Sequence, residues 1–144
     1  MEKNTKDLEL KIRARAHLKS RMEDLRDMFN RIDSEDDQVR EEAYTDFSEY
    51  ALAFDYVAPN TFKGQKQGYF RYQISWGGPS EEIRYYCDEN FTPYRIEFWF
   101  LDWFCGKGAK LHGKNLKLAE RVWREFEECG TVEALYMREM SDEE

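Results

Sequence analysis

A block of acidic side chains is the feature of this sequence with the most evident chemistry. Nine carboxylates lie between Asp33 and Asp55, opposed only by Arg40, so this stretch has a formal charge of −8. The whole 144-residue chain has the same formal net charge. Helical spacing places most of these acids on the outside of one predicted helix. The residues expected to contact a partner are Glu35, Asp37, Glu41, Glu42, Asp46 and Glu49.

A stripe of carboxylates on a helix has a spacing close to that of nucleic-acid phosphates. Side chains three and four residues apart on a helix are about 5–6 Å apart, and phosphates advance about 3.4 Å along one DNA strand. The stripe can therefore occupy Lys and Arg side chains that would otherwise bind phosphate. The alternative is internal neutralisation by the basic stretch 11–21, which contains five cations and no acid. Both interpretations remain open at the level of sequence.

A Gly- and Lys-rich segment is the second candidate. Residues 108–115, GAKLHGKN, nearly match the phosphate-binding pattern GxxxxGK[ST] and lie between a predicted strand and a predicted helix. Asn115 stands where the pattern needs a hydroxyl for magnesium. The possible anion-binding residues are Lys107, Lys110 and Lys114, with His112 beside them. They support an alternative function, a small enzyme that processes nucleotides or nucleic acid.

Thiol, imidazole and carboxylate chemistry has weaker support. Cys87, Cys105 and Cys129 show no CxxC spacing, and the chain has only two histidines, so neither a zinc site nor any other cofactor is expected. The cysteines are typical of reduced thiols in a cytoplasmic protein. Acids and arginines on the predicted strands are expected to form structural ion pairs across the sheet. We therefore predict a non-enzymatic protein.

The composition limits the class of partner. A net charge of −8 argues against direct DNA binding and against binding to anionic membranes, and it favours a basic, nucleic-acid-binding protein as partner. No segment approaches the roughly 20 apolar residues of a membrane span, and the N-terminus lacks the apolar stretch of a signal peptide. The expected location is the cytoplasm, which would be the host cytoplasm for a phage- or plasmid-encoded protein.

Hydrophobic periodicity predicts the elements that carry these residues. Apolar residues repeat at helical spacing over 5–32, 35–57 and 115–129, and they alternate in strand fashion over 69–76. Two further strands are predicted at 82–88 and 94–104, the last apolar on both faces and therefore expected to be covered twice. Residues 60–68 and 105–114 are predicted as loops. The pattern over 131–140 fits helix and strand equally.

These elements predict one α+β domain over residues 1–144. Its parts are an N-terminal helical hairpin (1–58), a three-stranded antiparallel meander (69–104), and a C-terminal helical segment (115–140) packed on the sheet. The hairpin is predicted because residues 33–34 leave only a short connection between the two helical patterns.

The stretch from Tyr69 to Phe104 resembles segments of small counter-defence proteins carried by phages and plasmids, of the anti-CRISPR and anti-restriction type. The resemblance rests on residues 76–80, WGGPS, and on the aromatic third predicted strand. It implies a host-directed inhibitor that occupies a basic nucleic-acid channel, such as that of a CRISPR or restriction nuclease complex. A viral or plasmid assembly protein, with the acidic face as a subunit contact, is a further alternative.

Overall fold

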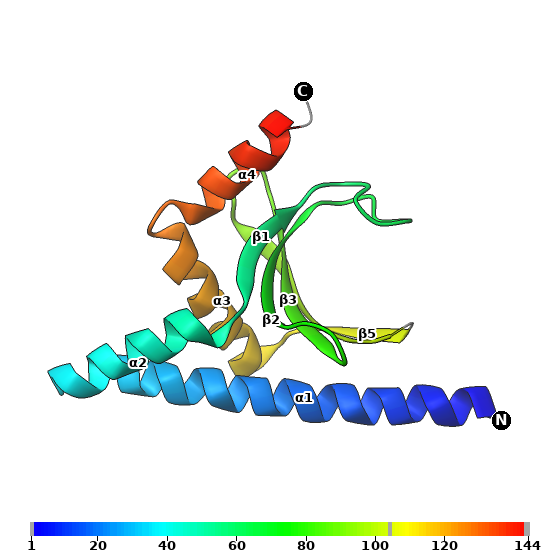
Figure 1. The fold of residues 1–144 in the computed structure, drawn as a ribbon, viewed down its shortest axis with the longest axis horizontal. Coiled ribbons are helices and arrows are strands. Elements are labelled where there is room, and N and C mark those ends of the chain that lie inside the picture. The colour runs from blue at the N-terminus through cyan, green and yellow to red at the C-terminus, as the bar shows by residue number, and fades with distance from the viewer. Residues whose placement is uncertain (1, 104, 143–144) are drawn as a thin grey trace.

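The computed structural model describes residues 2–103 and 105–142, which form four helices and a five-stranded antiparallel sheet (Figure 1). The strands follow one another in sheet order from β1 to β5, so the sheet is a simple meander. The elements in chain order are α1 (Glu2–Ile32), α2 (Asp37–Tyr50), β1 (Ala53–Val57), β2 (Tyr69–Ser75), β3 (Ser80–Cys87), β4 (Pro93–Asp102), β5 (Cys105–Lys110), α3 (Gly113–Glu127) and α4 (Thr131–Asp142).

The prediction of a three-stranded sheet is wrong, because two segments form edge strands. The first is β1, which was predicted as the end of the second helix. That helix stops at Tyr50, and Ala51 already has an extended backbone. Phe54 and Tyr56 then face the helices in strand alternation, where Phe54 stacks on Phe126 with ring centroids 4.1 Å apart. Phe54 and Val57 continue the helical spacing of Phe47 and Tyr50, which explains the error.

The second missed strand, β5, was predicted as a loop because of its glycines. Gly106 and Gly108 lie opposite Leu101 and Trp99 of β4. A Cβ atom at Gly108 would lie 2.1 Å from the Trp99 ring, and one at Gly106 would lie 2.6 Å from the Leu101 side chain. These glycines therefore give room to large neighbours on β4. They are strand residues that accommodate a close approach rather than turn residues.

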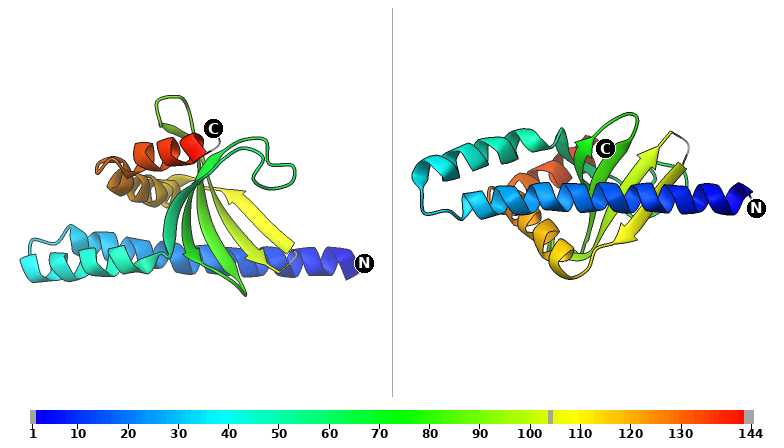
Figure 2. Two further views of the ribbon diagram at one scale, coloured as in Figure 1. Left: turned by 45° about the horizontal axis from the view of Figure 1, so that its top comes forward. Right: turned by 90° about the horizontal axis from the view of Figure 1, so that it is seen from below.

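The predicted N-terminal helical hairpin is also wrong. Helix α1 has 31 residues and α2 has 14, so α1 continues far beyond the segment that α2 covers (Figure 2). Its N-terminal half passes beneath β4 and β5 instead (Figure 1). The result is one long helix on which a short helix and the sheet both pack.

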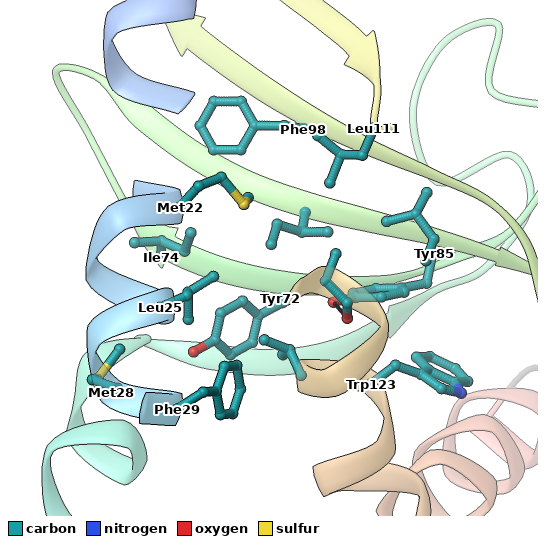
Figure 3. Packing of buried hydrophobic residues seen from close by; sticks show 14 of the residues in the cluster. Met22, Leu25, Met28, Phe29, Tyr72, Ile74, Tyr85, Phe98, Leu111 and Trp123 are labelled. Carbon is teal, nitrogen blue, oxygen red and sulfur yellow. Dashed lines mark hydrogen bonds between the residues drawn. The ribbon is translucent and has the colours of Figure 1, made fainter. Parts of the chain in front are cut away.

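The helices pack against one face of the sheet. Figure 3 shows Met22, Leu25 and Phe29 of α1 pointing toward Tyr72 of β2, with Trp123 of α3 beside Tyr85 of β3. The Tyr85 hydroxyl donates a hydrogen bond of 2.7 Å to the Ala119 carbonyl. The strands curve so that α3 and α4 lie on their convex side (Figure 1). No helix in the described part of the chain covers the concave face, so the expected double cover of β4 is wrong.

Local signals fix the ends of the helices. The Asp36 side chain caps α2 by accepting hydrogen bonds from the backbone N–H groups of Gln38 and Val39, at 2.9 and 3.2 Å. Helix α3 begins at Gly113, two residues before the predicted start. Residues 131–140, left open by the sequence, lie in helix α4. None of the described helices is both long and apolar enough to cross a membrane.

Candidate partner-binding surface

The acidic surface of α2 keeps four glutamates free of ion pairs. Among the described side chains, no Lys, Arg or His lies within 4 Å of their carboxylates. The other two predicted contact residues are paired: Asp37 bonds to Arg40, and Asp46 accepts a 2.8 Å hydrogen bond from Arg31. The exposed members without an ion pair, called here the acidic surface, are Glu41, Glu42 and Glu49 of α2 and Glu35, which lies in the connection before α2 and not on the helix as predicted.

The basic stretch of α1 does not neutralise this surface. Three of its five cations contact acids elsewhere: Lys11 lies 4.0 Å from Asp7, and Arg13 bonds to Asp102 of β4 at 2.6 Å. Arg21 bonds to Glu81 of β3 at 2.7 Å. In the described part of α1, the one cation that pairs with an acid of α2 is Arg31, which lies outside residues 11–21.

The remaining acids of the block have structural roles. Asp33 accepts two hydrogen bonds from Arg121 of α3, at 2.5 and 2.6 Å, and the Arg121 bonds hold the pKa of Asp33 below its ordinary value. Asp55 of β1 accepts a two-pronged bond from Arg71 of β2 at 2.7 and 3.0 Å. Together with the Asp36 cap, these contacts give three further acids of the block a partner within the protein.

The Gly/Lys segment does not assemble into a phosphate site. Lys107 points to the helical side of the sheet, where it forms an ion pair of 2.5 Å with Asp7. Lys110 is on the opposite face, because it pairs in register with Glu97. Lys114 belongs to α3, beside Arg26 and away from both. The three lysines therefore lie on three different surfaces, and an antiparallel strand leads into the segment rather than a parallel one.

The most buried carboxylate of the helix-covered face is Glu81, which is 2% exposed. It accepts hydrogen bonds from Arg21 at 2.7 and 3.0 Å and from Ser75 at 2.9 Å, and it lies 3.1 Å from His17 Nδ1. Burial favours a raised pKa, but the Arg21 and Ser75 bonds outweigh it and hold the pKa of Glu81 below its ordinary value. Glu81 is therefore ionised at neutral pH and joins α1 to the sheet.

The expected ion pairs of the strands are present, with one change of geometry. Arg71 pairs across strands with Asp55, whereas Arg84 and Arg95 bond to Glu82 and Glu97 of their own strands, both at 2.7 Å. Residues two apart on a strand share a face. These side chains lie on the concave face of the sheet, called here the open face because no described helix covers it. The sequence did not predict that this face is uncovered or that its charged side chains come together there. The alternation of Glu82, Arg84 and Tyr86 was the available signal.

The cysteines are expected to differ in reactivity. Burial, followed by the charges of Asp88 and Glu127, raises the pKa of Cys87 to about 12, whereas Cys105 and Cys129 are exposed. Because the thiolate is the reactive form, iodoacetamide should label Cys105 and Cys129 in the native protein and Cys87 only after unfolding. Peptide mass spectrometry measures which of the three cysteines is labelled. Labelling of all three cysteines at similar native rates would contradict the packing around Cys87.

Neither a metal site among the described residues nor a similar known protein helps to identify the function of this surface. Among the described residues, no three His, Cys, Asp or Glu side chains are grouped closely enough to hold a metal ion. Comparisons of the chain with protein-family models, curated proteins and solved structures found no match.

Proposed function

We propose that this chain is a non-enzymatic binding protein whose acidic surface on α2 docks into a basic site of a protein that handles nucleic acid. The observation that carries the proposal is that four exposed glutamates have no ion pair among the described side chains, although α1 is rich in cations. The partner class is a restriction or RNA-guided nuclease, as the resemblance of residues 69–104 to counter-defence proteins implies.

The physical role of the surface is charge complementarity. Like charges three or four residues apart on a helix repel one another by a few tenths of a kcal/mol per pair. Such a surface speeds association with a basic partner, and its effect falls as salt screens the charges. The N-terminal end of α2 lies at one end of the molecule, and the helix runs from there toward β1 (Figure 1), so a partner can approach this end without contacting the strands.

A charge-reversal experiment tests this function. We expect Glu41, Glu42 and Glu49 replaced together by Lys to lower the association rate with a target nuclease by about tenfold at about 50 mM NaCl. Protection of plasmid DNA from cleavage should fall in parallel. Biolayer interferometry and a cleavage assay measure the two effects, with restriction and RNA-guided nucleases as probes.

The matched control changes the net charge equally at other exposed positions. Glu89, Glu127 and Glu128 replaced together by Lys give the same formal net charge, yet these residues lie outside α2. The control should inhibit as the native protein does. Equal loss in both variants would mean that total charge matters and the acidic surface does not. Absence of inhibition by the native protein in every nuclease assay would contradict the partner class.

A further inference from the structure

The open face of the sheet carries a charged cluster that packing of the core does not require. Glu82 and Glu97 are 2% and 6% exposed, although no described helix covers them. Glu82 accepts a 2.7 Å hydrogen bond from Arg84 Nε, and Glu97 accepts bonds from Arg95 Nε at 2.7 Å and Trp99 Nε1 at 3.0 Å. Burying ionised groups costs several kcal/mol before pairing offsets it. Their retention here indicates a use at the surface.

The two carboxylates fix the side chains around them. Arg84 lies over two aromatic rings, 4.1 Å from the ring centroid of Trp99 and 4.8 Å from that of Tyr69. Its Nε bond to Glu82 uses one of the five N–H donors of the guanidinium. Such an arrangement holds a cation and a large ring in defined positions before a ligand arrives, which lowers the entropic cost of binding.

The neighbouring strand is shaped to accept this cluster. Gly108 of β5 lies against the Trp99 ring, and any Cβ atom there would overlap ring atoms at 2.1–2.6 Å. A side chain at this position would therefore displace Trp99 and the Arg84 guanidinium that lies over it. Because Gly108 has no side chain, the Trp99 ring can lie directly against β5 at this point.

The connection between β1 and β2 forms a wall over the cluster. Gln65 braces this loop, because its amide donates to the carbonyls of Ala58 and Gln67 at 3.1 and 2.9 Å and accepts from the Phe62 N–H at 3.1 Å. Gln67 in turn bonds to the Tyr94 hydroxyl of β4. The loop projects on the concave side of the strands (Figure 1) and is held by its own hydrogen bonds.

Loop and sheet together enclose a hollow of about 640 Å³, within the range of about 300–1,000 Å³ typical of small-molecule sites. Four cations and one carboxylate line it. Counting Glu82, which is bonded to Arg84, four cations still face two carboxylates, so the hollow is positive although the protein is acidic. Lys63 and Lys66 have no carboxylate within 4 Å among the described side chains. The charged and aromatic lining residues are Phe62, Lys63, Lys66, Tyr69, Arg84, Tyr86, Arg95, Glu97 and Trp99.

We propose that this hollow binds a nucleoside phosphate, free or as one unit of a single-stranded nucleic acid. Lys63 and Lys66 contact the phosphate, and the rings of Phe62 and Tyr86 pack against the planar base. Base–aromatic stacking contributes about 1–3 kcal/mol per base, and an anion fits the positive lining. The net charge of −8 opposes non-specific binding of a duplex over the surface, but it does not set the local charge of the hollow. This site is separate from α2 and does not depend on the function proposed for it.

Binding is tested with AMP, ribose 5-phosphate, and oligo(dT) and oligo(U) strands of about 12 nucleotides, at about 25 and 150 mM NaCl. The readouts are the Trp99 indole N–H signal in NMR spectra and the anisotropy of labelled strands. We expect Lys63→Glu with Lys66→Glu to weaken binding at least tenfold, and Gly108→Ala to weaken it as well. The control, Lys114→Glu with Lys117→Glu on α3, changes the charge equally and should alter affinity less than twofold.

Each outcome decides one part of the proposal. Strands that bind at least tenfold more tightly than AMP identify a single-stranded nucleic acid, and similar affinities identify a free nucleotide. Ribose 5-phosphate binding as tightly as AMP would overturn the role of the rings. Absence of binding by every probe at both salt concentrations would overturn the site. Weaker binding in the Lys114/Lys117 variant than in the Lys63/Lys66 variant would overturn its location. None of these results depends on inhibition of a nuclease.

Discussion

Replacing Glu81 by Ala is expected to lower the free energy of unfolding by about 3 kcal/mol at pH 7, the cost of removing one partner from a buried ion pair. The substitution would leave the Arg21 guanidinium, whose side chain is 26% exposed, without its two carboxylate bonds. It would also remove the acceptor of the Ser75 hydroxyl. Urea unfolding followed by tryptophan fluorescence measures the loss. A change below about 0.5 kcal/mol would be that of an ordinary surface position and would contradict the buried pair.

The same carboxylate predicts a pH dependence of stability. Because the pKa of Glu81 in the folded protein is below its ordinary value of 4.5, the ionised pair stabilises the fold fully above about pH 4.5. That contribution is lost as the pH falls through the lowered pKa. The difference in unfolding free energy between the native protein and Glu81→Gln should therefore shrink toward pH 3. A difference that stays constant from pH 7 to pH 3 would mean that folding does not lower the pKa of Glu81, and it would contradict the ionised pair.

Replacing Phe70 by Ala is expected to cost about 4 kcal/mol, as for large buried aromatics in other cores. Phe70 is 2% exposed and meets four rings, two from β1, one from α3 and one from the connection between β3 and β4. Its ring centroid lies 4.8 Å from that of Tyr56, 5.2 Å from Trp123, 6.1 Å from Phe54 and 6.2 Å from Phe91. Much of a typical stability of about 5–15 kcal/mol would be lost, and thermal unfolding monitored by circular dichroism should show it.

A second Phe→Ala substitution, at an exposed position, shows whether burial of the ring causes the loss of stability. Phe62 lies in the loop between β1 and β2 and is 51% exposed, so Phe62→Ala should change the unfolding free energy by less than about 0.5 kcal/mol. If both Phe→Ala variants were equally stable, Phe70 would not occupy the centre of the aromatic core.

The sequence predicted those elements whose patterns have one interpretation. The alternating strand that became β2 and the amphipathic helix that became α3 were located within two residues at their ends. The edge strands were not, for opposite reasons. Residues 53–57 carry aromatic rings that fit a helical repeat and a strand alternation equally. Residues 105–110 contain glycines that indicate a turn unless Trp99 is known to lie against them. Strand β1 depends on a partner beyond the next loop, at residues 69–73, whereas β5 depends on the side chains of the adjacent strand β4.

The candidate sites, like the strands and helices, could be predicted from the sequence only in part. Helical spacing placed the acids of the block on one helix, but Glu35 and Asp55 lie outside α2. No pattern could show that Arg31 pairs with Asp46 or that Arg13 turns to Asp102. Net charge was the wrong quantity for the open face, because the cations there come together from the loop between β1 and β2 and from the strands. A hollow made by a loop and three strands has no local sequence signature. The alternation of charged and aromatic residues along β3 and β4 indicates only the part of the hollow that the strands form.

The coexistence of a negative α2 and a positive hollow on one molecule can be measured without any partner. Cationic and anionic nitroxide probes enhance the NMR relaxation of amide protons according to the local electrostatic potential. The amides of residues 37–50 should relax more strongly with the cationic probe, and those of residues 62–67 more strongly with the anionic probe. Equal responses of both segments to both probes, or the reverse pattern, would contradict the claim.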